Sequence, residues 1–229
     1  MIKYHKDLEQ GTDEWHKLRL GIMTASNVKH LFTGKLAISK ANEVKTLAFE
    51  LAAQREMNHV DETFQSYHME RGHIEEIIAR DIYSEKIEQV KECGFITNEF
   101  EDFKIGYSPD GLVGDDGLIE IKSVIQKNQM KTIVSNEMPL EYMCQCQTGL
   151  LVSERKWIDF ISYSNGMPLF IKRVYPDFEL QQLIIEALTD FELSINEIQQ
   201  KFRVNSAPLI KTERVEHFRD DQITAGGES

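Results

Sequence analysis

Apolar residues recur every three or four positions in several parts of the chain, which is the spacing of one helix face. This pattern predicts helices over residues 43–55 and about 74–83, and a long closing helix over about 178–202. Pro139 is expected to open a further helix that runs to about Val152, because proline is tolerated in a first turn. The second of these helices carries its apolar residues at Ile74, Ile77, Ile78, Ile82 and Tyr83.

Between these helices the apolar period shortens toward two, which predicts β-strands. The run from Gly114 to Gly117 has strong turn chemistry and separates the second strand from the third. The order is helix, helix, three strands, helix, two strands, helix. It predicts an α/β or α+β fold in which helices flank one central mixed β-sheet. The expected strands cover residues 95–97, 103–107, 118–124, 157–164 and 169–175.

The composition places the 229-residue chain among soluble globular proteins, with 41% hydrophobic and 28% charged residues. No apolar run approaches the roughly 18 residues of a membrane span, and the start, MIKYHKDLEQ, lacks the apolar stretch of a secretory signal. Its three cysteines are interpreted as reduced structural thiols in a cytosol. With no repeat or linker, a single domain over residues 1–229 is expected, ending in a tail from about 205.

The net charge of −12 argues against a broad basic surface that wraps nucleic acid. The excess acid is concentrated, however, because residues 61–120 hold 5 basic and 16 acidic side chains. Two interpretations follow. The stretch is either a solvated acidic surface, or some of its carboxylates have a metal ion as their counter-charge.

Three charged residues in two neighbouring segments favour the metal interpretation. In a strand, Glu120 and Lys122 share one face while Ile119 and Ile121 share the other. The turn at residues 114–117 would pair this strand with the preceding segment and bring Asp110 beside Glu120. Two adjacent carboxylates form a hard oxygen site suited to Mg²⁺ or Mn²⁺. A nearby lysine could then orient or deprotonate a water molecule.

A third carboxylate is expected from the helix that precedes the strands. Glu76 can flank the buried stripe of that helix, and its neighbour Glu75 is expected to be more exposed. Two metal ions would clamp the attacking and leaving oxygens of an in-line displacement at phosphorus. A helix Glu, then Pro109-Asp110, then Glu120-x-Lys122 is the Pro-Asp…(Asp/Glu)-x-Lys nuclease pattern. Each piece alone also fits an exposed ion pair or an ordinary turn.

Five segments, taken in order, resemble the phage lambda exonuclease group. This group lies in the YqaJ-like viral recombinase branch of the restriction-endonuclease-like fold. The remaining third of the chain matches only in its outline of strands and a closing helix. The segments are residues 15–26 (WHKLRLGIMTAS), 72–80 (GHIEEIIAR), 108–112 (SPDGL), 118–122 (LIEIK) and 142–147 (YMCQCQ).

The resemblance implies a Mg²⁺-dependent exonuclease that digests one strand of duplex DNA from its 5′ end to mononucleotides. Asp110, Glu120 and the backbone carbonyl of Ile121 would be metal ligands, and Glu76 would hold a second ion. Lys122 would position the nucleophilic water. Mn²⁺ is expected to substitute for Mg²⁺, and Ca²⁺ is expected to inhibit.

The same resemblance implies a pocket for a 5′-terminal phosphate, and Arg19 gives it a forked set of donors. Trp15 is either a buried anchor or a ring that stacks on DNA, and both interpretations stay open. The remaining residues implied for the pocket are Ser26, Ser108 and Gln145.

Assembly, partner and location are also implied by the resemblance. The expected assembly is a homotrimer ring around DNA. The expected partner is a single-strand annealing protein, which takes up the 3′ strand in phage-type recombination. The expected location is the cytoplasm of a bacterial host. Two alternatives remain open: an endonuclease of the same fold, and a catalytically silent nuclease fold that only binds DNA.

Overall fold

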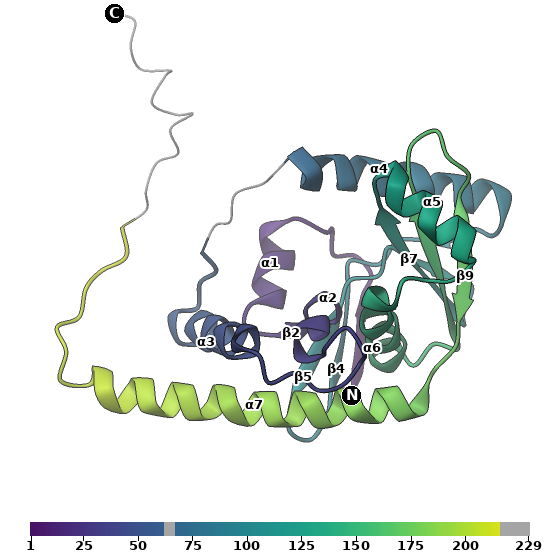
Figure 1. Cartoon of the computed structure of the whole chain (residues 1–229). Coiled ribbons are helices and arrows are strands. Elements are labelled where there is room, and N and C mark those ends of the chain that lie inside the picture. Colours follow the sequence, from purple (N-terminus) through teal and green to yellow (C-terminus); the bar gives the residue numbers. More distant parts are fainter. Residues whose placement is uncertain (62–66, 216–229) are drawn as a thin grey trace, which may run out of the picture.

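Two mixed β-sheets form the centre of the molecule in the computed structural model, which describes residues 1–61 and 67–215 (Figure 1). The four-stranded sheet has the order β1-β4-β5-β2, and only the β2–β5 pair is parallel. Its strands are β1 (Ile2–His5), β2 (Met23–Thr24), β4 (Phe95–Glu99) and β5 (Lys104–Tyr107). The predicted mixed architecture is therefore confirmed, although the strands divide between two hydrogen-bonded sheets.

The five-stranded sheet has the order β3-β6-β7-β8-β9. Its β7 and β8 are parallel, and the other neighbours are antiparallel. Parallel neighbours need a crossover, and the chain between β7 and β8 supplies it with helices. The strands are β3 (Val90–Lys91), β6 (Gly111–Val113), β7 (Gly117–Ser123), β8 (Trp157–Tyr163) and β9 (Phe170–Val174).

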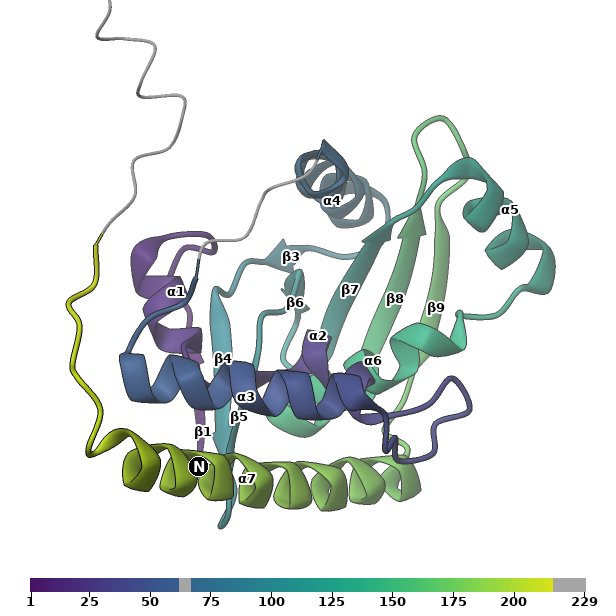
Figure 2. The same ribbon diagram turned by 60° about the vertical axis from the view of Figure 1, so that its left-hand side comes forward.

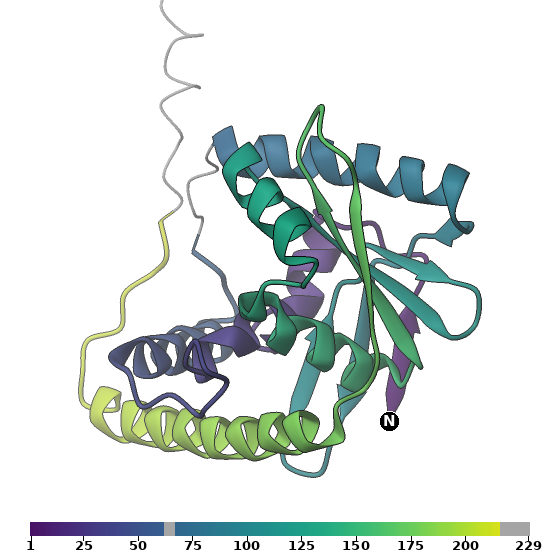
Figure 3. The same cartoon turned by 45° about the vertical axis from the view of Figure 1, so that its right-hand side comes forward.

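Two long helices, α3 (Asn42–Met57) and α7 (Phe178–Ser206), pack against each other on one side of the molecule (Figures 1 and 2). Arg55 of α3 forms a two-pronged ion pair with Glu192 of α7 and so ties them together. Helix α4 (Tyr67–Lys86) covers the five-stranded sheet at the other end of the molecule, as Figures 1 and 3 show. The shorter helices are α1 (Asp13–Arg19), α2 (Ala25–Val28), η1 (Lys29–Leu31), α5 (Gln126–Ser135), η2 (Leu140–Tyr142) and α6 (Met143–Ser153).

Strand β7 alternates between two different environments, as its sequence predicts. Ile119 and Ile121 belong to a small apolar cluster beneath α4, together with Ala79 and Tyr83 of that helix. Leu118 belongs to the larger core, which also includes residues of α3, α6 and α7. Glu120 and Lys122 alternate with these isoleucines, so their side chains point away from this apolar cluster.

The long helices and strands form near the predicted places, although α4 is longer than the predicted residues 74–83 and α5 was not predicted. Helix α4 also differs in its buried face. Ala79 and Tyr83 are buried, whereas Ile74, Ile77 and Ile78 are exposed. The expectation of a buried stripe through these isoleucines is therefore wrong. The reason is that α4 contacts the sheet through small and aromatic residues. Short elements such as β1, β2 and β6 carry too few residues for a periodic signal.

The closing helix α7 reaches Ser206, and therefore extends beyond its predicted end near residue 202. The expected tail is described only to residue 215, and residues 216–229 lie outside the described part. Among the helices that the structure describes, none is long and apolar enough to cross a membrane.

Candidate active site

A tight hairpin between β6 and β7 brings the first two acidic residues together. Gly111 pairs with Ile119, so Asp110 and Glu120 are the next pair of residues along the two strands. The turn contains Gly114 in the left-handed region with φ +50°. Arg155 donates to the carbonyl oxygens of Gly114 and Gly117, at 3.1 and 2.6 Å, and so fixes the ends of the turn. The expected hairpin is therefore present.

Glu120 is almost fully buried, at 1% exposure, and receives donors from three elements. Tyr107 of β5 donates its hydroxyl to Glu120 Oε2 at 2.8 Å. Gln145 of α6 donates its side-chain amide to Oε1 at 2.5 Å. Lys122 Nζ lies 2.9 Å from the same Oε1. Both carboxylate oxygens are thus held by side chains of the protein.

Asp110 lies beside this carboxylate in an unfavourable electrostatic environment. Its Oδ2 accepts a hydrogen bond from the backbone N–H of Ile121 at 2.5 Å. Burial, and next the negative charges of Glu120 and Glu76, raise the pKa of Asp110 well above its ordinary value. The three carboxylates therefore repel one another inside the protein.

Glu76 of α4 completes the acidic group. Burial raises its pKa, the charge of Arg80 opposes that shift, and the charge of Glu120 adds to it. Arg80 lies 3.8 Å from Glu76, donates to the Asp110 carbonyl oxygen at 3.1 Å, and pairs with Glu92 at 3.1 Å. Arg80 thus joins α4 to the segment that carries Asp110.

The neighbouring carboxylate, Glu75, is placed differently from the prediction. Glu75 is 8% exposed, whereas the side chain of Glu76 is 27% exposed. The expectation that Glu75 is the more exposed of the two is therefore wrong. Glu75 is held in the interior by Ser123 at the end of β7, whose hydroxyl donates a hydrogen bond to Glu75 Oε2 at 2.5 Å. The carboxylate whose charge acts on Asp110, and which feels the charge of Glu120, is nevertheless that of Glu76.

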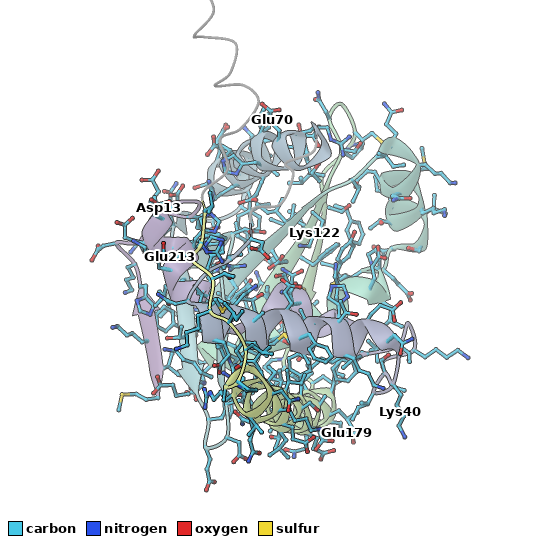
Figure 4. All side chains as sticks on the ribbon, turned by 90° about the vertical axis from the view of Figure 1, so that its left-hand side faces the viewer. Asp13, Lys40, Glu70, Lys122, Glu179 and Glu213 are labelled. Atoms are coloured by element: carbon cyan, nitrogen blue, oxygen red, sulfur yellow. The ribbon has the colours of Figure 1, made fainter. Side chains whose placement is uncertain are left out.

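Lys122 is the cation closest to this carboxylate group. Burial lowers its pKa, but the charges of Glu120 and Asp110 outweigh burial and raise the pKa above its ordinary value. Its Nζ also lies 5.6 Å from the centre of the Tyr142 ring, a cation–π contact. Figure 4 shows Lys122 between α4 and α3.

The donor chemistry of this group fits a hard divalent cation. In the described part of the chain, no three Asp, Glu, His or Cys side chains are already arranged to hold an ion. Glu120 is bonded to Tyr107, Gln145 and Lys122, and Asp110 is bonded to backbone. The three carboxylates nevertheless repel one another. Lys122 and Arg80, which Glu92 shares, neutralise only part of their negative charge. A divalent cation would neutralise the remaining excess.

A second polar group surrounds Arg19 at the end of α1, and it contacts Ser108, two residues before Asp110. Arg19 donates to Ser108 Oγ at 2.8 Å, and its guanidinium lies 4.0 Å from the centre of the Trp15 ring. The indole N–H of Trp15 contacts the Gly94 carbonyl oxygen at 3.1 Å and Ser108 Oγ at 3.2 Å. Trp15 therefore anchors α1 and supports Arg19 at the same time.

Arg19 lacks a counter-anion among the residues that the structure describes. Among the described residues it forms no ion pair within 4.0 Å, and burial lowers its pKa to about 10. It lines a pocket of about 610 Å³ together with Trp15 and His16. A half-buried guanidinium without a carboxylate is a favourable place for a phosphate group.

The four residues predicted for the phosphate pocket do not all contact one another. Arg19 and Ser108 are hydrogen-bonded, whereas Ser26 Oγ lies 3.1 Å from Thr24 Oγ1. Gln145 bonds Glu120. Ser108 is two residues before Asp110, so the pocket and the acidic group are joined through one short segment.

Sequence reasoning did not identify Tyr107 as a site residue. It belongs to the four-stranded sheet and Glu120 to the five-stranded sheet, so strand periodicity offers no signal for their contact. The three cysteines are all buried and free. Cys146 lies near the acidic group, where burial raises the pKa of its thiol well above the ordinary value.

Comparison with known proteins gives consistent results. Residues 14–156 match the model of the YqaJ-like viral recombinase domain. No curated protein sequence matches the chain. A structure of LHK-Exo in complex with dAMP is 32% identical, with a TM-score of 0.77, and the match covers 87% of this chain and 100% of that chain.

Two further solved structures are similar. LHK-Exo from Laribacter hongkongensis, described as an alkaline exonuclease, has a TM-score of 0.70 at 32% identity, over 85% of this chain and 100% of that chain. A phage-related exonuclease from Haemophilus somnus has a TM-score of 0.56 at 14% identity, over 81% of this chain and 98% of that chain. The last likeness concerns the fold alone.

Proposed function

Because this chain belongs to the YqaJ-like viral recombinase family and is a nuclease, we propose that it digests one strand of linear double-stranded DNA from the 5′ end. Its fold is the restriction-endonuclease-like one that the sequence predicts. The products would be mononucleotides and a 3′ single strand. The observation that carries this proposal is the acidic group of Glu76, Asp110 and Glu120, with Lys122 bound to Glu120. The unneutralised Arg19 is hydrogen-bonded to Ser108, two residues before Asp110.

Asp110, Glu120 and the backbone carbonyl of Ile121 would hold one Mg²⁺, and Glu76 would hold a second. Bound Mg²⁺ supplies Lewis acidity and charge neutralisation at the scissile phosphate. Mn²⁺ is expected to replace it, whereas Ca²⁺ is expected to inhibit. The charge repulsion that raises the pKa of Asp110 and of Glu76 supports this role, since a divalent cation would relieve it.

Lys122 would position the nucleophilic water through a hydrogen bond. The neighbouring carboxylates raise its pKa, so the ammonium stays protonated at neutral pH and donates rather than accepts. Its cation also faces the phosphate whose charge increases during attack. Glu120 holds Lys122 at 2.9 Å, so one contact orients both residues.

Arg19 would bind the terminal 5′-phosphate, with Ser26, Ser108 and Gln145 as neutral donors. The lack of a carboxylate partner for Arg19 in the described structure supports this role, because phosphate would supply the missing negative charge. Trp15 would maintain the guanidinium plane by stacking. A terminal phosphate held here would place the next bond near Asp110, since Ser108 precedes it by two residues.

The family supports a proposal for the biological setting. We propose that residues 1–229 act as a single exonuclease domain, that three copies form a ring around the DNA, and that a single-strand annealing protein receives the 3′ strand. The reaction would take place in the cytoplasm of a phage-infected or lysogenic bacterium. An endonuclease of this fold is the competing function.

The decisive experiment compares two DNA substrates in Mg²⁺. One is linear duplex with a labelled 5′-phosphorylated end, and the other is covalently closed circular duplex. The proposal predicts early release of labelled mononucleotide from the linear DNA and an intact circle. A cut circle would favour the endonuclease, and linear DNA that releases no nucleotide would contradict the proposal.

A further inference from the structure

Tyr107, at the end of β5, occupies a position that is shaped for its ring. It is buried, with 1% of its surface exposed, and it lies against Gly149 of α6. A Cβ atom at position 149 would come within 2.8 Å of the tyrosine ring. Only glycine leaves this space, so the two residues are matched in size.

The hydroxyl of this ring has a specific acceptor. It donates to Glu120 Oε2 at 2.8 Å, while the opposite oxygen of Glu120 receives Gln145 and Lys122. Donors on both oxygens restrain rotation of the carboxylate about its last bond. Glu120 is 1% exposed, so water could not easily replace a lost donor at Oε2.

We propose that Tyr107 is a positioning residue: its hydroxyl orients Glu120 and thereby sets the affinity of the acidic group for divalent cations. This inference rests on the proposed function, because it requires Glu120 to be a metal ligand. Hydrogen bonds to metal-ligating carboxylates typically change metal affinity by about 10- to 100-fold when they are removed. Among the described residues the Tyr107 hydroxyl donates to Glu120, whereas Arg19 donates to Ser108, so the two hydrogen bonds are separate.

A second buried tyrosine supplies a matched control. Tyr83 of α4 is fully buried and donates its hydroxyl to Asp159 at 2.7 Å. Asp159 is held by Arg173 and is not part of the acidic group. Tyr83→Phe and Tyr107→Phe therefore remove the same chemical contact, a buried hydroxyl to a buried carboxylate, at two separate places.

The test is calorimetric titration of Mn²⁺ into the full-length protein, without DNA, for wild type and for both variants. We expect Tyr107→Phe to weaken Mn²⁺ binding about 10-fold, and Tyr83→Phe to leave it unchanged. Equal Mn²⁺ affinity in Tyr107→Phe and wild type would overturn the inference while leaving the proposed function intact. A similar loss in Tyr83→Phe would also overturn it. A wild-type protein that binds no Mn²⁺ would overturn both.

A second pair of variants tests the same contact by a different route. Gly149→Ala should displace the ring and weaken Mn²⁺ binding in the wild-type background, since its added methyl overlaps the ring. In the Tyr107→Phe background it should cause little further loss, because the hydroxyl is already gone. If the two substitutions lower the Mn²⁺ affinity of the double variant by the product of their separate factors, the inference is contradicted. Thermal unfolding of each variant confirms that the proteins compared are folded.

Discussion

Two buried tyrosine–carboxylate clusters lie on opposite faces of the neighbouring strands β7 and β8, and they differ in charge balance. In one, Tyr83 and Arg173 surround Asp159, and the arginine donates to both carboxylate oxygens at 2.8 Å. In the other, Tyr107 holds Glu120, but Asp110 and Glu76 add negative charge nearby.

The first cluster is neutralised within itself. The hydrogen bond to Asp159 raises the pKa of Arg173, which keeps the pair charged and attached, and Trp157 stacks on the guanidinium at 3.5 Å. The second cluster keeps an excess of acid that raises the pKa of Asp110. The balanced cluster therefore joins α4 to the sheet without excess charge, whereas the unbalanced one is the site that we propose for a divalent cation.

The largest effect should come from Lys122→Ala in the unbalanced cluster. Loss of the positioned donor should reduce DNA hydrolysis by about 10²- to 10⁴-fold, while binding of DNA ends is retained. Steady-state release of nucleotides and an end-binding titration measure the two properties separately. Normal turnover in this variant would remove Lys122 from the proposed chemistry.

The balanced cluster should respond in stability rather than in catalysis. Arg173→Met leaves the buried charge of Asp159 with only Tyr83, and it should lower the free energy of unfolding by about 2 kcal/mol. Chemical denaturation measures this loss. Specific activity of the remaining folded protein should be unchanged, and a parallel fall in activity would mean that the clusters are not separate in function.

The phosphate pocket adds a third charge arrangement to the comparison, because Arg19 has no carboxylate partner among the described residues. Arg19→Ala should reduce the preference for 5′-phosphorylated over 5′-hydroxyl ends by about 10-fold, because one charge-assisted contact is lost. The ratio of kcat/KM for the two substrates is the measurement. If that ratio does not change, the phosphate is recognised elsewhere.

The same ratio should depend on pH in wild type. Arg19 is charged below its pKa of about 10 and neutral above it. The preference for phosphorylated ends should therefore be present at pH 8 and decline as pH rises through about 10. Taking the ratio of kcat/KM values cancels titrations that affect both substrates equally, and kcat/KM reports the free enzyme. A ratio that stays constant to pH 11, about one unit beyond that pKa, would contradict the lowered pKa of Arg19.

The smallest effect concerns stability at the acidic group. Asp110→Asn removes one of three repelling carboxylates, so the metal-free protein should become more stable, by about 1 kcal/mol. Metal-dependent hydrolysis should be lost in the same variant. Asp159→Asn in the balanced cluster is the control and should be destabilising instead. A destabilised, fully active Asp110→Asn protein would reverse the contrast between the clusters.

Much of the site could be predicted because it depends on local order. The turn at residues 114–117 and strand alternation together place Asp110 beside Glu120. The choice of Glu76 rests instead on the resemblance of residues 72–80 to the family, because the helix phase wrongly predicted that Glu75 is the more exposed. The burial of Glu75 could not be predicted, since it depends on Ser123 at the end of a strand distant in sequence. The Tyr107 contact joins two sheets, and no periodic pattern within one strand contains that information.

The fold shows the same division between local and distant information. Long periodic helices such as α3 and α7 are evident in the sequence, because each buries a continuous stripe. The face that α4 buries is set by the sheet beneath it, and there Ala79 and Tyr83 fit closely while Ile74 stays in solvent. Periodicity predicts that a helix exists more reliably than it predicts which side meets the core.

The central claim is that the unbalanced acidic group hydrolyses DNA only when a divalent cation completes it. The most direct test follows nucleotide release from 5′-phosphorylated linear duplex by protein stripped of metal, first in chelator and then with Mg²⁺ added. The account predicts no release in chelator and restored release with Mg²⁺. Sustained release in the presence of chelator would contradict it.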